Sequence, residues 1–200
     1  MKSVAAFSAL LASVLARPQG YETPAPAPGP AYFQVLSARS ASPIHFRPLQ
    51  ANGGKFWLGG TPSGYCPVEV VGNATCEQYP GNQTTLAGGF GTLSLGVVVP
   101  GGQQVYIAPD GRMSYTTAHS AYVPEGSVRD GWSRTFREDP TDPLGSLAFE
   151  GGLIACPDPA DQYNPWAVYG QTANFTAPSA DCLVFSSITT NETDAGAWQY

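Results

Sequence analysis

Two histidines are the first residues of this 200-residue chain to consider for chemistry, because nucleophilic catalysis needs a base beside the nucleophile. His119 precedes Ser120, whereas His45 lies between apolar residues in an expected strand. The Gly-x-Ser-x-Gly motif, which presents a nucleophilic serine on a sharp turn, does not occur. We therefore interpret both histidines as structural and predict no catalytic residue.

Acidic residues cluster at 138–142 and at 158–161. Glycoside hydrolysis uses a pair of carboxylates across a cleft. Both clusters also contain proline, and acidic residues beside proline are common in turns, so we interpret them as turns. A secreted hydrolase that uses Asp158 or Asp142 is the competing hypothesis. Neither cluster has the regularly alternating oxygen ligands of a calcium loop, and we predict no metal site and no cofactor.

The first sixteen residues predict export from the cell. Lys2 supplies a positive start, and residues 4–16 form an unbroken run of apolar and small side chains. This run is about half the length that spans a bilayer, and Val14 and Ala16 occupy the minus-three and minus-one positions where signal peptidase requires small side chains. We predict a signal peptide at 1–16 and no membrane anchor, since no second apolar run follows.

Export changes the interpretation of the four cysteines, because an even number of cysteines in an oxidising compartment predicts disulfides. Three pairings are possible. Short loop closures cost less entropy, so we favour Cys66 with Cys76 and Cys156 with Cys182. A zinc site is disfavoured because no Cys-x-x-Cys occurs and both histidines lie far from either pair in sequence.

Four Asn-x-Thr triplets predict sites for N-linked glycan in an exported chain. The acceptors are Asn73, Asn82, Asn174 and Asn191, and we expect at least two of them to be occupied. Glycan would add solubility to a chain in which only 12% of residues are charged. Removing Lys2 takes the formal net charge from -6 to -7, and such a surface attracts neither nucleic acid nor anionic lipid.

The chain is predicted to form one domain after an extended arm. Residues 17–30 contain five prolines and no apolar periodicity, which is typical of a solvated arm. The domain is expected at 31–200, where short segments rich in β-branched and aromatic residues end at Gly, Pro, Asn or Asp. Ten of these segments are expected strands: 32–37, 44–49, 55–58, 92–99, 104–108, 112–117, 146–150, 153–156, 167–170 and 183–188.

The spacing of these segments predicts an all-β fold, an antiparallel barrel or sandwich of about ten short strands with two disulfides. Two hairpins are expected, one at 105–116 with Asp110-Gly111 in its turn and one at 146–156 with Gly151-Gly152 in its turn. A loose similarity of both hairpins to residues 55–60 suggests a β-trefoil as the alternative fold.

Aromatic residues offer a surface for sugar, because their rings have apolar faces and polar edges. Trp57 and Trp166 lie in or beside expected strands, and we expect them to be buried. Trp132 and Trp198 lie in expected loop or terminal sequence, and we predict that these two are exposed and able to stack on glycan. This pair is the basis of a second functional hypothesis, a polysaccharide-binding module.

Four segments carry a resemblance to a known family: residues 39–46 (RSASPIHF), 56–59 (FWLG), 104–111 (QVYIAPDG) with Tyr115-Thr116, and 147–157 (LAFEGGLIACP). They resemble the PhiA family, the phialide-associated secreted cell-wall proteins of filamentous fungi, which include IgE-binding allergens and plant-cell elicitors. The resemblance implies an all-β, disulfide-stabilised wall or extracellular protein that takes part in forming asexual spores, with no established enzymatic reaction.

From these features we predict a secreted, N-glycosylated, non-enzymatic fungal protein of the wall or extracellular space. Its expected role is to support phialide and conidium development and wall integrity. The expected partners are cell-wall polysaccharide or other wall proteins, bound non-covalently. The alternatives are a polysaccharide-binding module and a host-recognised elicitor or allergen.

Overall fold

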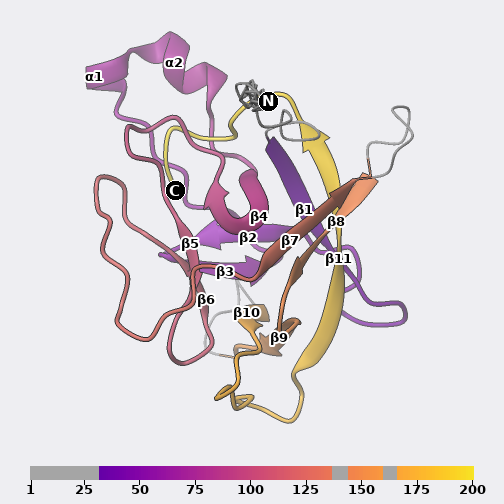
Figure 1. Ribbon diagram of the computed structural model, residues 1–200. Coiled ribbons are helices and arrows are strands. Elements are labelled where there is room, and N and C mark those ends of the chain that lie inside the picture. Colours follow the sequence, from indigo (N-terminus) through magenta and orange to yellow (C-terminus); the bar gives the residue numbers. More distant parts are fainter. Residues whose placement is uncertain (1–31, 137–143, 160–165) are drawn as a thin grey trace, which may run out of the picture.

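The computed structural model describes residues 32–136, 144–159 and 166–200, in which eleven strands join into one curled antiparallel sheet, a half-barrel (Figure 1). This architecture confirms the predicted antiparallel all-β fold. Two short helices, α1 (Val68–Val71) and α2 (Asn73–Gln78), project from the sheet at the upper left of Figure 1. The strands are β1 (Tyr32–Ala38), β2 (Leu49–Asn52), β3 (Lys55–Leu58), β4 (Leu86–Leu95), β5 (Val105–Ile107), β6 (Met113–Tyr115), β7 (Trp132–Phe136), β8 (Leu144–Phe149), β9 (Leu153–Pro157), β10 (Trp166–Gly170) and β11 (Leu183–Glu192).

Three expectations concern residues outside the described ranges. They are the signal peptide at 1–16, the extended arm at 17–30 and the acidic cluster that contains Asp142. Among the helices that the structure does describe, none is both long enough and apolar enough to cross a membrane.

β11 connects the two halves of the sheet. Its residues 183–185 pair with β9. Its later residues pair with β1 along the full length of that strand and with β8 near their end. Buried and half-buried residues alternate along β1, so Phe33 and Val35 enter the core while Gln34 faces outward. The long strand β11 therefore places the outer face of β1 beside residues near position 192.

The hairpin predicted at 105–116 is confirmed, because β5 and β6 pair along their full length. Gly111 has a φ of +85°, a conformation that side chains other than glycine rarely adopt. The Asp110 carboxylate accepts a hydrogen bond from the Arg112 backbone N–H at 3.0 Å. The aspartate and the glycine thus have the turn roles that the sequence indicated.

The second predicted hairpin, at 146–156, is wrong. β8 pairs with β7 and β11, whereas β9 pairs with β10 and β11. β8 and β9 are both antiparallel to β11 and meet successive parts of it, residues 189–190 and 183–185, so they run in the same direction and do not pair with each other. Gly151 helps to turn the chain between the halves of the sheet, and an added Cβ there would lie 1.6 Å from the Gln171 carbonyl oxygen. The three similar hairpins of the β-trefoil alternative are therefore absent from the described residues.

The strand expected at 44–49 begins only at Leu49. Ahead of it, the Ser37 hydroxyl donates a hydrogen bond to the Ile44 carbonyl, which holds Ile44 fully buried within a loop. Phe46 follows with a φ of +57°, a conformation that is incompatible with an extended strand. The apolar residues of this segment reach the core through a loop and not through sheet pairing.

The end of the sequence runs through the core. Ala197 is fully buried and forms β-bridges with both Pro80 and Val97. The Gln103 side-chain amide binds both backbone groups of Tyr200: its Nε2 donates to the Tyr200 carbonyl at 2.8 Å, and its Oε1 accepts from the Tyr200 N–H at 2.8 Å. Such a fully paired buried amide fixes this segment in one position.

Two disulfides form, Cys66–Cys76 and Cys156–Cys182, and the predicted local pairing is confirmed. The first encloses most of the segment with α1 and α2, neither of which has a buried residue. The second joins β9, where Cys156 is buried, to the residue that precedes β11. The second bridge therefore connects core strands, whereas the first closes a surface segment.

We expect the two disulfides to stabilise the protein unequally. Replacing Cys156 and Cys182 by serine opens a closure with a sequence separation of 26, and chain entropy predicts a loss of about 3.5 kcal/mol in the free energy of unfolding. The separation of 10 between Cys66 and Cys76 predicts at most about 2.7 kcal/mol, with the loss concentrated in α1 and α2. Urea unfolding followed by fluorescence and circular dichroism measures both, and a larger loss for the first pair would contradict this order.

The buried hydroxyl of Tyr200 is expected to contribute to the free energy of unfolding. Its hydroxyl accepts a hydrogen bond from the Thr85 backbone N–H at 3.2 Å. Tyr200→Phe leaves that buried N–H without its acceptor, so the free energy of unfolding at pH 7 should fall by about 1–3 kcal/mol. Tyr122→Phe is the matched control, because the Tyr122 side chain is exposed and should lose nothing.

The pH dependence of this stabilisation follows from the direction in which the pKa of Tyr200 is shifted. Burial raises the pKa of Tyr200 from 10 to about 12, so the fold favours the neutral phenol. The stabilisation is therefore complete below pH 10 and is lost as the pH rises through 12. The stability difference between wild type and Tyr200→Phe should shrink over this range in denaturant titrations. A constant difference would refute the assignment.

Candidate functional site

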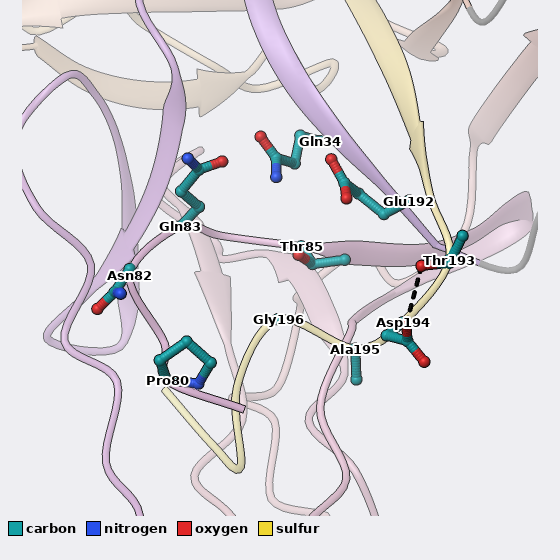
Figure 2. A pocket seen from close by; sticks show the side chains of 10 residues that line it. All are labelled: Gln34, Pro80, Asn82, Gln83, Thr85, Glu192, Thr193, Asp194, Ala195 and Gly196. Carbon is teal, nitrogen blue, oxygen red and sulfur yellow. Dashed lines mark hydrogen bonds between the residues drawn. The ribbon is translucent and has the colours of Figure 1, made fainter. Parts of the chain in front are cut away.

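Two adjoining pockets form one polar groove beside β1, which we call the β1 groove. The first has a volume of about 500 Å³ and lies where β1 begins and β11 ends (Figure 2). The second, of about 410 Å³, follows β1 toward β2. Both are lined by Gln34, Asn82 and Gln83. The first is also lined by Pro80, Thr85, Glu192, Thr193, Asp194, Ala195 and Gly196, and the second by Val35, Leu36, Pro48, Leu49, Gln50 and Thr84.

The groove exists because the neighbours of β1 on this side diverge. β4 pairs with β1 only at its first two residues, and Pro48, just before β2, forms a bridge to Leu36 farther along. Between these contacts, Gln34 and Val35 have strand partners only on β11 among the described residues. The order of the strands therefore leaves an opening along the middle of β1.

The segment at 82–85 forms one wall of this opening and is hydrogen-bonded to β2. Thr84 is buried, and its hydroxyl accepts a hydrogen bond from the Ala51 backbone N–H at 2.7 Å. The Thr84 N–H donates in turn to Gln50 Oε1 at 3.1 Å. These two bonds tie the wall to β2.

Tyr200 supports the same segment from the core. Its hydroxyl donates to the Gln83 carbonyl and accepts from the Thr85 backbone N–H. At Gly196 an added Cβ would lie 2.4 Å from Thr85 Oγ1 and 2.8 Å from the Tyr200 hydroxyl, so only glycine fits. The wall and the end of the chain are thus packed as one unit.

Four polar side chains of the groove have no hydrogen-bonding partner among the residues that the structure describes. Gln34, Asn82, Gln83 and Glu192 form no side-chain hydrogen bond or ion pair within the part of the chain that the structure describes. Figure 2 shows Gln34, Gln83 and Glu192 projecting toward the same opening from different segments. Amides both donate and accept, and a carboxylate accepts, so the groove suits a ligand rich in hydroxyl groups.

Sequence reasoning missed this groove because its lining comes from segments that lie far apart in the chain. The one local signal is the polar run at 82–85 (NQTT), which predicts a glycan acceptor at Asn82 but does not indicate a groove. Nothing in the sequence pattern indicated that Gln34 and Glu192 lie opposite this run. Their proximity depends on the pairing of β1 with β11.

The prediction that Trp132 is exposed is wrong. Trp132 lies in β7, is only 2% exposed and packs against Phe149 with ring centroids 5.0 Å apart. β7 was not among the expected strands, and it lies between β4 and β8, so its inward side chains enter the core. Trp198 is half-buried. The proposed stacking pair therefore does not form an exposed aromatic surface.

An exposed aromatic residue occurs elsewhere, at Phe46. Its side chain is 57% exposed and stacks on His45 with ring centroids 3.8 Å apart. The Phe46 N–H donates to the Ser37 carbonyl, one residue beyond the end of the β1 groove. The sequence predicts a strand at 44–49 and therefore does not indicate that Phe46 is exposed. The positive φ that turns Phe46 outward has no sequence signature in a phenylalanine.

The residues considered for catalysis lie in separate places. His45 Nδ1 accepts a hydrogen bond from the Arg39 backbone N–H at 3.2 Å. His119 and Ser120 line a pocket of about 300 Å³ on another part of the surface, where Ser120 Oγ accepts from the Tyr122 N–H. Asp158 lies close enough to Arg112 to interact with it. No group of three or more potential metal ligands occurs among the described residues.

Two buried arginines support the sheet beneath the surface. Arg112 lies over the Trp57 ring, 4.1 Å from its centroid, and burial lowers the pKa of its guanidinium. Arg134 lies 3.8 Å from the centroid of Phe33 and donates to Asn191 Oδ1 at 3.0 Å. Burial lowers the pKa of Arg134 to about 10, which still leaves it charged at neutral pH.

Comparison with known proteins finds one matching family model and two relatives. Residues 33–200 match the model of the PhiA-like secreted protein family. An uncharacterized secreted protein of Arthroderma benhamiae is 39% identical over 163 residues, which cover 76% of this chain and 77% of that protein. The cell wall protein phiA of Emericella nidulans is 29% identical over 176 residues, covering 85% and 82% of the two chains. No solved structure was found to match. The chain therefore belongs to the PhiA-like secreted protein family.

Proposed function

We propose that this secreted protein acts as a non-enzymatic component of the fungal cell wall and supports phialide and conidium development. The observation that carries the proposal is the family match over nearly all of the described domain, together with a relative named as a cell wall protein. The two disulfides suit a protein that must remain folded outside the cell.

The surroundings of the chemically capable residues support a non-enzymatic role. His45 is occupied by a backbone hydrogen bond and a stacked ring, and Asp158 interacts with the buried Arg112. In the β1 groove the Thr193 hydroxyl donates to the Asp194 carboxylate at 2.8 Å, and no histidine or lysine lines either pocket among the described residues. The other polar side chains of the groove are amides and hydroxyls, which suit binding.

N-glycosylation is part of the proposal, and the four acceptors differ in their surroundings. Asn73, Asn82 and Asn174 are exposed. Asn191 is half-buried in β11, and its side chain accepts a hydrogen bond from Arg134. A glycan on Asn191 would have to share this crowded position with a buried guanidinium. We therefore assign glycan to the three exposed acceptors.

Glycopeptide mapping of the secreted protein tests this assignment. Mass spectrometry after enzymatic release in ¹⁸O water should show modification at Asn73, Asn82 and Asn174, with Asn191 the least occupied. Asn191→Gln should leave the electrophoretic mobility of the glycoprotein unchanged. Full occupancy of Asn191 would contradict the structural argument.

Wall fractionation tests the proposed function. In a conidiating fungus that produces the protein, we expect a substantial fraction to remain with washed walls and to be released by hot detergent or by glucanase. A reporter that carries only residues 1–16 should appear in the medium and serves as the control for export alone. Complete recovery of the protein from the medium, with none extracted from walls, would refute the wall role. Deletion of the gene should reduce conidium number.

A further inference from the structure

We propose that the β1 groove binds a neutral saccharide chain in extended form, with Gln34 and Gln83 as its main hydrogen-bonding contacts. The inference rests on the proposed function, because it names the partner class through which the protein would meet the wall. Trp132 is buried, so the aromatic sugar-binding surface predicted from the sequence does not exist. The site proposed here is built from amide side chains instead.

The first argument is the chemistry of the free side chains. Gln34 and Gln83 each carry an amide that can donate two hydrogen bonds and accept others, and Glu192 adds a carboxylate acceptor on the same opening. A sugar ring presents hydroxyl groups that donate and accept around its whole edge. Every free group of the groove can therefore be paired by the hydroxyls of one ligand, which limits the desolvation cost of binding.

The second argument concerns the classes of ligand that the lining residues disfavour. Among the described residues no lysine or arginine lines either pocket, and the first pocket contains the carboxylates of Glu192 and Asp194. A phosphate or another anion would meet negative charge without a cation to balance it. An acyl chain would leave the amides unpaired. A neutral, hydroxyl-rich ligand avoids both penalties.

The third argument is the length of the groove. The two pockets meet at Gln34, Asn82 and Gln83 and continue in opposite directions, one toward Asp194 and the other toward Pro48. Their volumes, about 500 and 410 Å³, each lie in the range of small-molecule sites. A linear chain of sugars can occupy both pockets, with the shared glutamines at its centre.

The fourth argument is rigidity. The wall at 82–85 is tied to β2 through Thr84 and to the core through Tyr200. A ligand therefore does not have to order a loop when it binds, and less of its interaction energy is lost to entropy. The remaining cost is the ordering of the half-buried Gln34 and exposed Gln83 side chains themselves.

The same chemistry has two sources, because the glycan acceptor Asn82 lies where the pockets meet. One source is a separate wall polysaccharide. The other is the glycan attached to Asn82, which would fill the groove and exclude the polymer. Both sources predict that Gln34 and Gln83 contact sugar, and only the behaviour of an Asn82 variant separates them.

The experiment measures binding of laminarihexaose, chitohexaose and mannohexaose by calorimetry to the full secreted protein and to Asn82→Gln. The double substitution Gln34→Ala/Gln83→Ala is then introduced into the protein that binds an oligosaccharide, either the wild type or Asn82→Gln. It should raise the dissociation constant at least about tenfold, because two or more hydrogen bonds are lost. Gln78→Ala on α2 is the matched control, since Gln78 is exposed and lies outside the groove. Glu192→Gln serves as a second groove variant, and thermal unfolding verifies that each protein is folded.

Binding by the wild type identifies a separate polysaccharide, and binding only after Asn82→Gln identifies the attached glycan. The proposal is overturned if neither background binds any of the three probes, or if binding is unaffected by both groove variants. It is also overturned if Phe46→Ala abolishes binding while the glutamine variants do not. These results can be told apart from failure of the wall role. If the protein stays with the walls but binds no sugar, the wall role stands and the groove proposal falls. If the protein binds sugar but is found only in the medium, the wall role falls and the groove proposal stands.

Discussion

The pairing of Gln103 with Tyr200 is the interaction on which the rest of the structure depends. One buried amide binds the backbone N–H and carbonyl of Tyr200, and the Tyr200 hydroxyl then binds the backbone at Gln83 and Thr85. Through these four bonds the end of the chain is held in the core and the wall of the β1 groove is held against it. Three of these bonds are buried, and the bond to the Gln83 carbonyl is partly buried, so breaking a buried one leaves a polar atom without water or partner.

The curled sheet provides the frame around this contact. β11 pairs with strands of both halves, so β1 lies on a long and continuous neighbour while its other side meets β4 and the start of β2 at separate points. The groove is the space between those points. It is polar and carries negative charge at one end, in a domain of low overall charge.

Sequence reasoning succeeded where structure is decided by neighbouring residues. Asp110-Gly111 specifies a turn, and the hairpin of β5 and β6 forms there. It failed at 146–156, which has similar local chemistry, because β8 and β9 pair with successive parts of β11, a strand from far along the chain, and not with each other. It failed at Trp132 for a related reason, since β7 is an inner strand only through its contacts with β4 and β8.

The sequence by itself determined the all-β class, the four Asn-x-Thr triplets and the family to which the chain belongs, and it favoured the disulfide pairing that the structure contains. These features depend on composition, short spacings and local motifs, whose energies are contained within a few residues. Tertiary structure alone decided which aromatic rings are exposed, which acceptor is crowded by a buried arginine, and that Gln34, Gln83 and Glu192 share one opening. The physical reason is that the order of strands in a sheet arises from many weak contacts between distant segments, and no single segment encodes it.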